Sequence, residues 1–239
     1  MSWIITDEYK GQRQELVPAG KYDAVCSIIA DVGHEYWPRY KKWNRKIFLG
    51  FEIPELRTEF TDQNGNEINK PRLMTRRFPL NINVGKDGGK KSDLRKFLER
   101  WKGGELERDA NGNSIVDFEK LGNFPCQLEV EHVTKNGTTY ANIDRVYPFQ
   151  GENKPTVEGD VIFFSLDKIP KGENPIDHFP ANCPPWIYDS FLNSREAQEW
   201  DNRHKEDTDW DNAQVPSQND TDDNSTPDDT ADTDDDFPF

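Results

Sequence analysis

The feature that most constrains the fold is the order of segments along the chain in which apolar residues recur with the spacing of a strand or of a helix. Three segments, at residues 20–30, 43–53 and 72–82, show the pattern of β-strands with one buried face. A segment with helical spacing follows, and residues 125–133 and 138–147 then return to the strand pattern. The side chains expected on the buried faces of the first two strands are Tyr22, Ala24, Cys26, Ile28 and Ala30, and Trp43, Ile47, Leu49, Phe51 and Ile53.

Turn residues and a capped helix separate these segments. Asn64-Gly65 and Asn136-Gly137 are dipeptides typical of tight turns between antiparallel strands. Ser92 can cap the helix, and Gly103 would stop it. Pro79 would require the third strand to lie at a sheet edge or to contain a bulge. The apolar face expected for the helix is Leu94, Phe97, Leu98 and Trp101.

The order strand-strand-strand-helix-strand-strand is that of a five-stranded OB-fold barrel, so the expected fold class is mainly β. An apolar run at 161–166 predicts an added strand, and Pro184-Pro185 opens a second helix. The expected regions are an N-terminal arm (1–15), an OB-fold domain with a C-terminal extension (16–200) and a disordered acidic tail (201–239). The apolar face expected for the second helix is Trp186, Ile187, Phe191 and Leu192.

Negative charge is concentrated at the C-terminus. From Glu206 to Phe239 the chain has 12 Asp, one Glu and no Lys or Arg, whereas the other 205 residues hold 30 basic and 32 acidic groups. A near-neutral body with an acidic tail indicates nucleic-acid binding or a regulated interaction tail.

Several classes of protein are excluded by simpler features. The chain contains no run of about 20 apolar residues, so no transmembrane helix is predicted. The first ten residues, MSWIITDEYK, lack the basic and long apolar regions of a signal peptide. The three cysteines are an odd number at wide spacing and predict no disulfide framework, so a cytoplasmic location is expected.

Residues 36–48 combine aromatic and basic side chains and contain no acidic residue. Single-stranded nucleic acid needs both, because bases stack on aromatic faces and cations follow the phosphates. In an OB-fold this segment is the loop between the first two strands, which binds oligonucleotides. The alternative is that Trp43 and Phe48 are core residues and the lysines form a solvated face. The residues concerned are Tyr36, Trp37, Tyr40, Trp43 and Phe48, with Arg39, Lys41, Lys42, Arg45 and Lys46.

A second basic cluster lies between residues 70 and 102, with 11 Lys and Arg against three acidic residues. Its local positive field is suited to a polyanion. A basic helix face that pairs with the acidic tail is a compatible alternative. The residues expected to contact DNA are Arg76, Arg77 and Phe78 on the third strand and Lys90 and Lys91 in a glycine-rich loop.

No pattern predicts catalysis. The loop at 85–92 resembles a phosphate-binding loop, but only three residues separate Gly85 from Gly89, and Lys90 is followed by a second lysine. The histidines are scattered, no Cys-x-x-Cys occurs, and no group of carboxylates in the body is arranged as a nuclease metal site. We therefore predict no catalytic residue, no metal, no cofactor and no enzymatic activity.

The last six residues form a separate motif. Exposed aromatic rings are unfavourable in a solvated acidic segment, so this ending predicts a docking peptide. Its terminal ring would fill an apolar pocket of a partner, a basic residue would bind the carboxylate, and the aspartates would steer the approach. The motif consists of Asp234, Asp235, Asp236, Phe237, Pro238 and Phe239.

The motif and the body each resemble known proteins. The ending is similar to the Asp-Asp-Asp-Ile-Pro-Phe tip of bacterial single-stranded DNA-binding proteins, which recruits replication and repair enzymes; Phe237 replaces the isoleucine. The body resembles a family of bacteriophage single-stranded DNA-binding proteins with an OB fold. The resemblance implies the host cytoplasm, no catalysis and the coating of replication intermediates. It rests on PAGKY at 18–22, IADVG at 29–33, FE at 51–52, KSDLR at 91–95, LGNFPC at 121–126, YANI at 140–143 and PWI at 185–187.

The predicted function is therefore a sequence-tolerant single-stranded DNA-binding protein that coats replication and recombination intermediates and recruits partners through its tip. A phage metal-dependent nuclease or recombination enzyme and an acidic DNA mimic are the alternatives, and a homo-oligomer is left open. Bases would stack on some of Tyr36, Trp37, Tyr40, Trp43, Phe78 and Tyr140. Phosphates would contact Arg39, Lys41, Lys42, Arg45, Lys46, Arg76, Arg77, Lys90 and Lys91.

Overall fold

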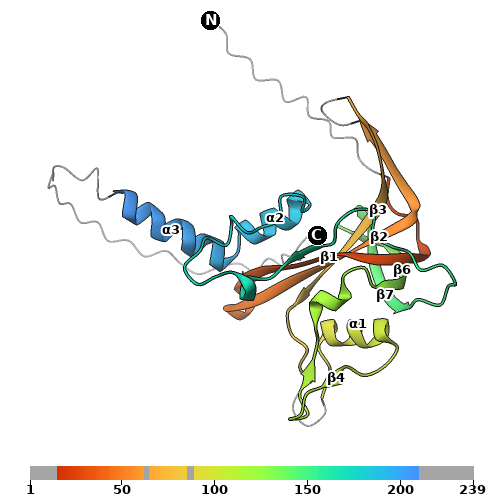
Figure 1. The fold of residues 1–239 in the computed structure, drawn as a ribbon, viewed down its shortest axis with the longest axis horizontal. Helices are drawn as coiled ribbons and strands as arrows, with labels where there is room; N and C mark the ends of the chain where they lie inside the picture. Colours follow the sequence, from red (N-terminus) through yellow and green to blue (C-terminus); the bar gives the residue numbers. More distant parts are fainter. Residues whose placement is uncertain (1–14, 62–64, 85–88, 210–239) are drawn as a thin grey trace, which may run out of the picture.

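The computed structural model describes residues 15–61, 65–84 and 89–209, which form a mainly β structure (Figure 1). The predicted tip motif and most of the predicted N-terminal arm lie outside these residues. One sheet has the antiparallel order β3-β2-β1-β6-β7, and β8 pairs parallel to β1. The strands are β1 (Gly20–Trp37), β2 (Lys42–Thr61), β3 (Glu67–Pro79), β6 (Pro125–Lys135), β7 (Thr138–Pro148) and β8 (Ile162–Phe164), with a separate small hairpin of β4 (Glu107–Arg108) and β5 (Ser114–Ile115).

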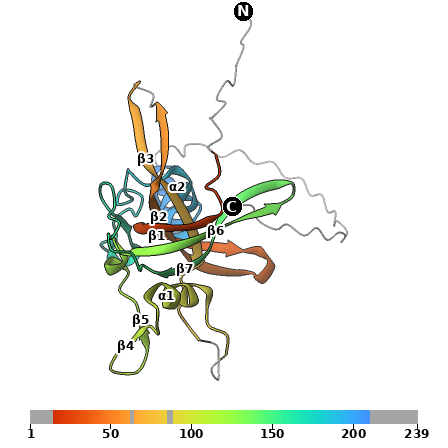
Figure 2. The same ribbon diagram turned by 90° about the vertical axis from the view of Figure 1, so that its right-hand side faces the viewer.

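The helices lie on opposite sides of the sheet. Helix α1 (Asp93–Lys102) packs on one side, and α2 (Pro185–Leu192) packs on the other, followed by α3 (Arg195–Asp209) (Figure 2). None of the helices among the described residues is long and apolar enough to cross a membrane. The prediction for α1 is confirmed, since Ser92 Oγ accepts a hydrogen bond from Arg95 N and Gly103 ends the helix in the left-handed conformation.

Helix α3 continues past the predicted start of the tail. The polar composition after Trp200 led us to expect disorder from residue 201, but the helix ends at Asp209. Its first turn explains why it forms, because Ser194 Oγ accepts a hydrogen bond from Ala197 N at 3.3 Å and the Ala197 side chain is buried. The predicted acidic tail therefore begins inside a helix.

Two hydrophobic cores share the central strand β1. The inner core lies between the sheet and α1, and the outer core lies between the sheet and α2. A register shift between Cys26 and Ile28 changes the faces of β1, so that Cys26 and Ile29 enter the inner core and Ile28 enters the outer core. The predicted single buried face of the first strand is therefore wrong after Cys26. The outer core consists of Ile28, Ala30, Val32, Phe48, Phe164, Phe179, Cys183, Ile187, Phe191 and Ala197.

The segment expected to be a loop between the first two strands is instead a long hairpin. Strands β1 and β2 continue to Trp37 and Lys42, and the 3₁₀ turn η1 (Pro38–Tyr40) joins them. Lys41 adopts the left-handed conformation (φ 47°), which reverses the chain in few residues. Backbone pairing therefore fixes the positions of the side chains in this segment.

Several other predictions are confirmed. Asn136 and Gly137 both have positive φ, 49° and 79°, as a two-residue hairpin turn requires. Pro79 ends β3, which is an edge strand, so its missing N–H interrupts no ladder. The added strand is β8.

The apolar face predicted for the second helix is only partly buried in α2. Ile187 and Phe191 are buried, whereas Trp186 and Leu192 are exposed.

The sheet does not close into the predicted five-stranded barrel. Strands β3 and β7 lie at the two ends of the antiparallel order, and no ladder pairs them within the described ranges. One side chain bridges the gap, since Arg76 Nη1 donates to the carbonyl oxygens of Ile143 (2.6 Å) and Asp144 (2.9 Å) on β7. We call this gap the seam.

Candidate nucleic-acid interface

The end of the β1–β2 hairpin carries four exposed aromatic rings. We call residues 36–43 the hairpin tip. Its rings, those of Tyr36, Trp37, Tyr40 and Trp43, are between 40% and 54% exposed. Trp43 was expected to share the buried face of Ile47 and Leu49, but it lies beyond the end of the core and packs against Tyr36, its partner across the strands. The tip is thus an aromatic surface open to solvent.

The four rings form two pairs, each with a cation beside it. Tyr36 and Trp43 have ring centroids 5.3 Å apart, and the Arg195 guanidinium lies 5.8 Å from the Trp43 ring. On the other side, Trp37 and Tyr40 meet edge to face at 4.6 Å, and Lys46 Nζ lies 5.4 Å from the Trp37 ring. Both sides of the tip therefore combine an aromatic face with positive charge, as stacked bases and their phosphates require.

Three cations at the tip have no ion pair within the described part of the chain. Arg39, Lys41 and Lys42 are all exposed, and only Arg39 contacts a ring, that of Tyr40 at 5.8 Å. Cations without an ion-pair partner give up no ion pair when they meet a phosphate. The structure leaves these three predicted phosphate-binding residues exposed and, among the described residues, without an ion pair.

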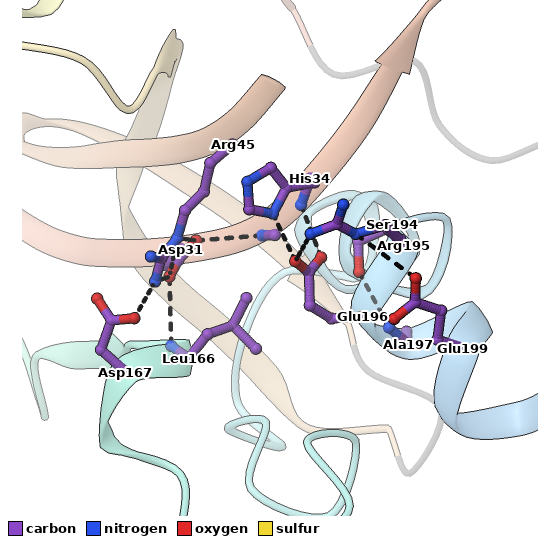
Figure 3. Close-up of polar contacts among 11 residues, drawn as sticks. Asp31, His34, Arg45, Leu166, Asp167, Ser194, Arg195, Glu196, Ala197 and Glu199 are labelled. Atoms are coloured by element: carbon purple, nitrogen blue, oxygen red, sulfur yellow. Dashed lines mark hydrogen bonds and ion pairs between the residues drawn. The ribbon is translucent and has the colours of Figure 1, made fainter. Parts of the chain in front are cut away.

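The base of the hairpin is fixed against the C-terminal part of the chain (Figure 3). His34 donates its backbone N–H to Glu196 Oε2 at 2.8 Å, and His34 Nδ1 lies 2.5 Å from Glu196 Oε1. Gly33 makes this approach possible. It has φ +74°, and a Cβ at this position would lie 2.5 Å from Glu196 Oε2 and 2.8 Å from Ser194 Cβ. The hairpin therefore projects from an anchored base.

A buried carboxylate adds a second anchor. Asp31 accepts hydrogen bonds from Gly33 N (3.1 Å) and Leu166 N (3.2 Å) and pairs with Arg45, which also contacts Asp167 at 2.9 Å. Burial alone would lower the pKa of Arg45, but hydrogen bonds and charge from Asp31 and Asp167 raise it above its usual value. Arg45 thus has an internal role, although it was predicted to contact phosphate.

The residues predicted on the third strand divide among three environments. Phe78 is only 2% exposed and packs on Phe97 with ring centroids 4.9 Å apart, so its predicted role in base stacking is wrong. Arg76 bridges the seam. Arg77 lies on the opposite face of β3, where Arg77 Nη2 contacts Glu35 Oε2 at 2.6 Å.

Glu35 also brings together two predicted phosphate-binding residues. Its carboxylate lies 2.6 Å from Arg77 and 4.0 Å from Lys46. Burial and the nearby Arg77 charge lower the pKa of Lys46, and Glu35 opposes this effect. An anionic group therefore already lies between these two cations, beside Trp37.

The remaining predicted residues are more dispersed. Lys90 is exposed, whereas Lys91 pairs with Glu99 of α1 at 2.7 Å. Tyr140 is half-buried on β7, opposite Val133. No contact described by the structure links these three residues to the hairpin tip.

Trp186 is an exposed aromatic residue that the sequence prediction placed on the apolar face of the second helix. It is 52% exposed and lines a groove of about 740 Å³, together with Phe48, Thr75, Arg76, Arg77 and Asn142. Ser190, one helical turn along α2, lines the same groove. A polar residue four positions after Trp186 is the sequence signal that this side of the helix faces solvent.

Two further features of the described residues are their metal-ligating side chains and their cysteine thiols. No group of three or more His, Cys, Asp or Glu side chains among them is arranged to hold a metal ion. Cys26 and Cys126 are buried, and burial raises the pKa of both thiols well above the usual value.

No model of a protein family matches this chain, and a search of curated proteins found no matching sequence.

Proposed function

We propose that this chain is a sequence-tolerant single-stranded DNA-binding protein that coats replication and recombination intermediates. The observation that carries the proposal is the hairpin tip, where four exposed rings lie among the unpaired cations Arg39, Lys41 and Lys42. A cluster of exposed rings is unfavourable in water unless a ligand covers it. Bases stack on such rings regardless of sequence, because every base has an aromatic face.

The arrangement of the strands supports an OB-type fold as part of the proposal. An OB barrel has five strands in Greek-key order, with oligonucleotides bound by the loop between strands 1 and 2 and the neighbouring faces. Here β1 lies between β2 and β6, α1 follows β3 in sequence, and the β1–β2 connection carries the hairpin tip. We infer an OB barrel left open at the seam.

The acidic C-terminus would supply the second activity. We propose that Asp234 to Phe239 recruit replication, recombination or repair proteins of the host, as the resemblance of the tip motif implies. These residues lie outside the described part of the chain. Their sequence, three carboxylates followed by two aromatic rings around a proline, is the support for the proposal.

Titration with a dye-labelled oligo-dT, followed by fluorescence anisotropy, tests the first activity. We expect tight binding to single strands and weak binding to duplex, because stacking needs unpaired bases. One domain should cover about 4–16 nucleotides, and the log affinity should fall with log salt by about 0.7 per phosphate contacted.

Two outcomes would favour the alternatives. Cleavage of DNA in the presence of Mg²⁺ would indicate a nuclease. Absence of DNA binding, even after removal of residues 206–239, would indicate an acidic protein that acts through its tail alone. Equal affinity for duplex and single strand would contradict base stacking.

The substitution Glu35→Gln should strengthen DNA binding at low salt. It removes a negative charge between Arg77 and Lys46 and leaves both cations available to a phosphate. We expect an increase of about 2- to 5-fold, the size of a surface charge interaction, and a steeper dependence on salt. Glu107→Gln is the matched control, because Glu107 lies on the separate β4–β5 hairpin and pairs there with Lys102 of α1. Equal effects of the two variants would mean that only net charge matters.

A further inference from the structure

We propose that the groove beside Trp186 is a second base-binding site, which continues the DNA path from the hairpin tip onto the C-terminal extension. This inference rests on the proposed function and assigns to α2 a role in binding. The ligand class is a nucleotide unit of single-stranded DNA, with its base on the Trp186 ring and its phosphate near the cations of β3.

The groove has the size and lining that a nucleotide requires. Its volume of about 740 Å³ falls within the range of about 300–1,000 Å³ typical of small-ligand sites. Trp186 offers a large apolar face, whereas Thr75, Ser190 and Asn142 offer hydrogen-bonding groups. A mixed lining of this kind suits a base with polar edges better than it suits a purely apolar partner.

The charges that line the groove are divided between its walls, with two arginines on β3 and two carboxylates on β6 and β7, so a phosphate is expected on the β3 side. Arg76 and Arg77 both line it. Arg77 Nε is buried and has no hydrogen-bond acceptor among the described residues, so this guanidinium is incompletely satisfied by Glu35. Two acidic residues also lie there. Asp144 pairs with Arg145 at 3.1 Å, and Glu131 is exposed, so that salt screens its charge.

Arg77 makes the groove continuous with the hairpin. Its guanidinium contacts Glu35, which lies two residues before Trp37 on β1, and the same side chain lines the groove. Lys46 links the two regions further, since it lies near both Glu35 and the Trp37 ring. A strand that stacks on Trp37 can therefore follow these cations along the outer face of β2 and β3 to Trp186.

The outer core holds Trp186 in place before any ligand arrives. Ile187 and Phe191 of α2 are fully buried, and Phe191 stacks on Phe179 with ring centroids 4.8 Å apart. These contacts fix the rotation of the helix, so Trp186 and Ser190 face the groove. An aromatic platform on a rigid helix binds with little loss of conformational entropy.

Anisotropy titrations with labelled oligo-dT of two lengths test the groove, using the variants Trp186→Ala and Trp186→Phe of the full chain. Lengths of about 5 and about 16 nucleotides span the site size of one OB domain. With the longer oligonucleotide, we expect Trp186→Ala to bind about 5- to 150-fold more weakly, the loss of one stacked base. Trp186→Phe should retain most of the affinity. The shorter oligonucleotide should bind both variants as it binds the unmodified protein, because the hairpin tip alone can hold it.

Two controls separate the failure of this inference from failure of the proposed function. Ile115→Ala removes an exposed apolar side chain on the β4–β5 hairpin and should change nothing. If Trp37→Ala weakens binding but Trp186→Ala does not, the groove inference is wrong and the proposed function stands. If the unmodified protein binds neither oligonucleotide, both are wrong.

Photocrosslinking provides a readout that does not depend on the stability of the variants. Each oligonucleotide carries 5-iodouracil at one position, and the position is moved along the series. Some positions should crosslink to the hairpin tip, and positions several nucleotides away, within the site size of one domain, should crosslink to Trp186. Mass spectrometry that finds the peptide containing Trp186 among the products would support the site. Products confined to the hairpin tip at every position would overturn it.

Discussion

Replacing both Trp37 and Trp43 by alanine should weaken the binding of single-stranded DNA at least 5- to 150-fold and lower the melting temperature only slightly. One stacked base contributes about 1–3 kcal/mol, and the two rings lie in different aromatic pairs at the tip. Both rings are exposed, so their removal leaves no cavity in either core. Anisotropy titrations and thermal unfolding of the same samples measure the two quantities.

The single variants assign the effect to one side of the hairpin or to both. Trp37 lies beside Lys46, toward the groove, whereas Trp43 lies beside Arg195 of α3. If the path follows the outer face of β3, Trp37→Ala should cause the larger loss. A lower melting temperature with unchanged affinity per folded molecule would instead make these tryptophans packing residues.

Replacing Arg76 by methionine should lower the free energy of unfolding by on the order of 3 kcal/mol. Arg76 donates two hydrogen bonds to carbonyl groups across the seam, and its guanidinium lies 5.1 Å from the Phe78 ring centroid. A hydrogen bond from a charged group contributes about 1.5–3 kcal/mol, and the carbonyl groups left behind are partly buried. In a domain of this size, the melting temperature should fall by about 6–12 °C.

Arg77→Met is the matched control because it changes the adjacent residue in the same way. Arg77 contacts Glu35 and makes no hydrogen bond across the seam within the described residues, so its loss should weaken DNA binding and alter stability less. Urea unfolding of both variants compares their stabilities, and DNA titration compares their affinities. If Arg76→Met reduces affinity without changing stability, Arg76 contacts phosphate as the sequence predicted.

Much of the sheet could be predicted because alternation and turn chemistry are local signals. The faces of Ile47 to Ile53 and the Asn136-Gly137 turn depend on nearby residues alone. The change of faces after Cys26 could not be predicted, since a bulge shifts the register by one residue without altering the apolar composition. Helix α3 was missed because its stability comes from packing and a cap at Ser194 rather than from a periodic apolar face.

The candidate site was predictable in composition and less so in geometry. Aromatic and basic residues at 36–48 identified the tip, but the ion pairs of Arg45 and Arg77 involve partners far away in the sequence. Phe78 follows two arginines in the sequence, and only the packing of α1 shows that its ring points inward. Trp186 was assigned to the apolar face of the second helix because the sequence pattern groups it with Ile187, Phe191 and Leu192.

Because strand β1 contributes to both cores, the five-stranded sheet and the C-terminal helices cannot be separated into two independently folding parts. A chain shortened to end before β8 would keep all five long strands but would uncover Ile28, Ala30 and Phe48, and such a strip would drive self-association. The C-terminal helices, expressed alone, would lack the surface on which they fold. Genetic exchange between relatives could replace the hairpin tip without disturbing either core, whereas a crossover within β1 would have to satisfy two sets of neighbours at once. We therefore expect recombination breakpoints to avoid the part of β1 that contributes to both cores.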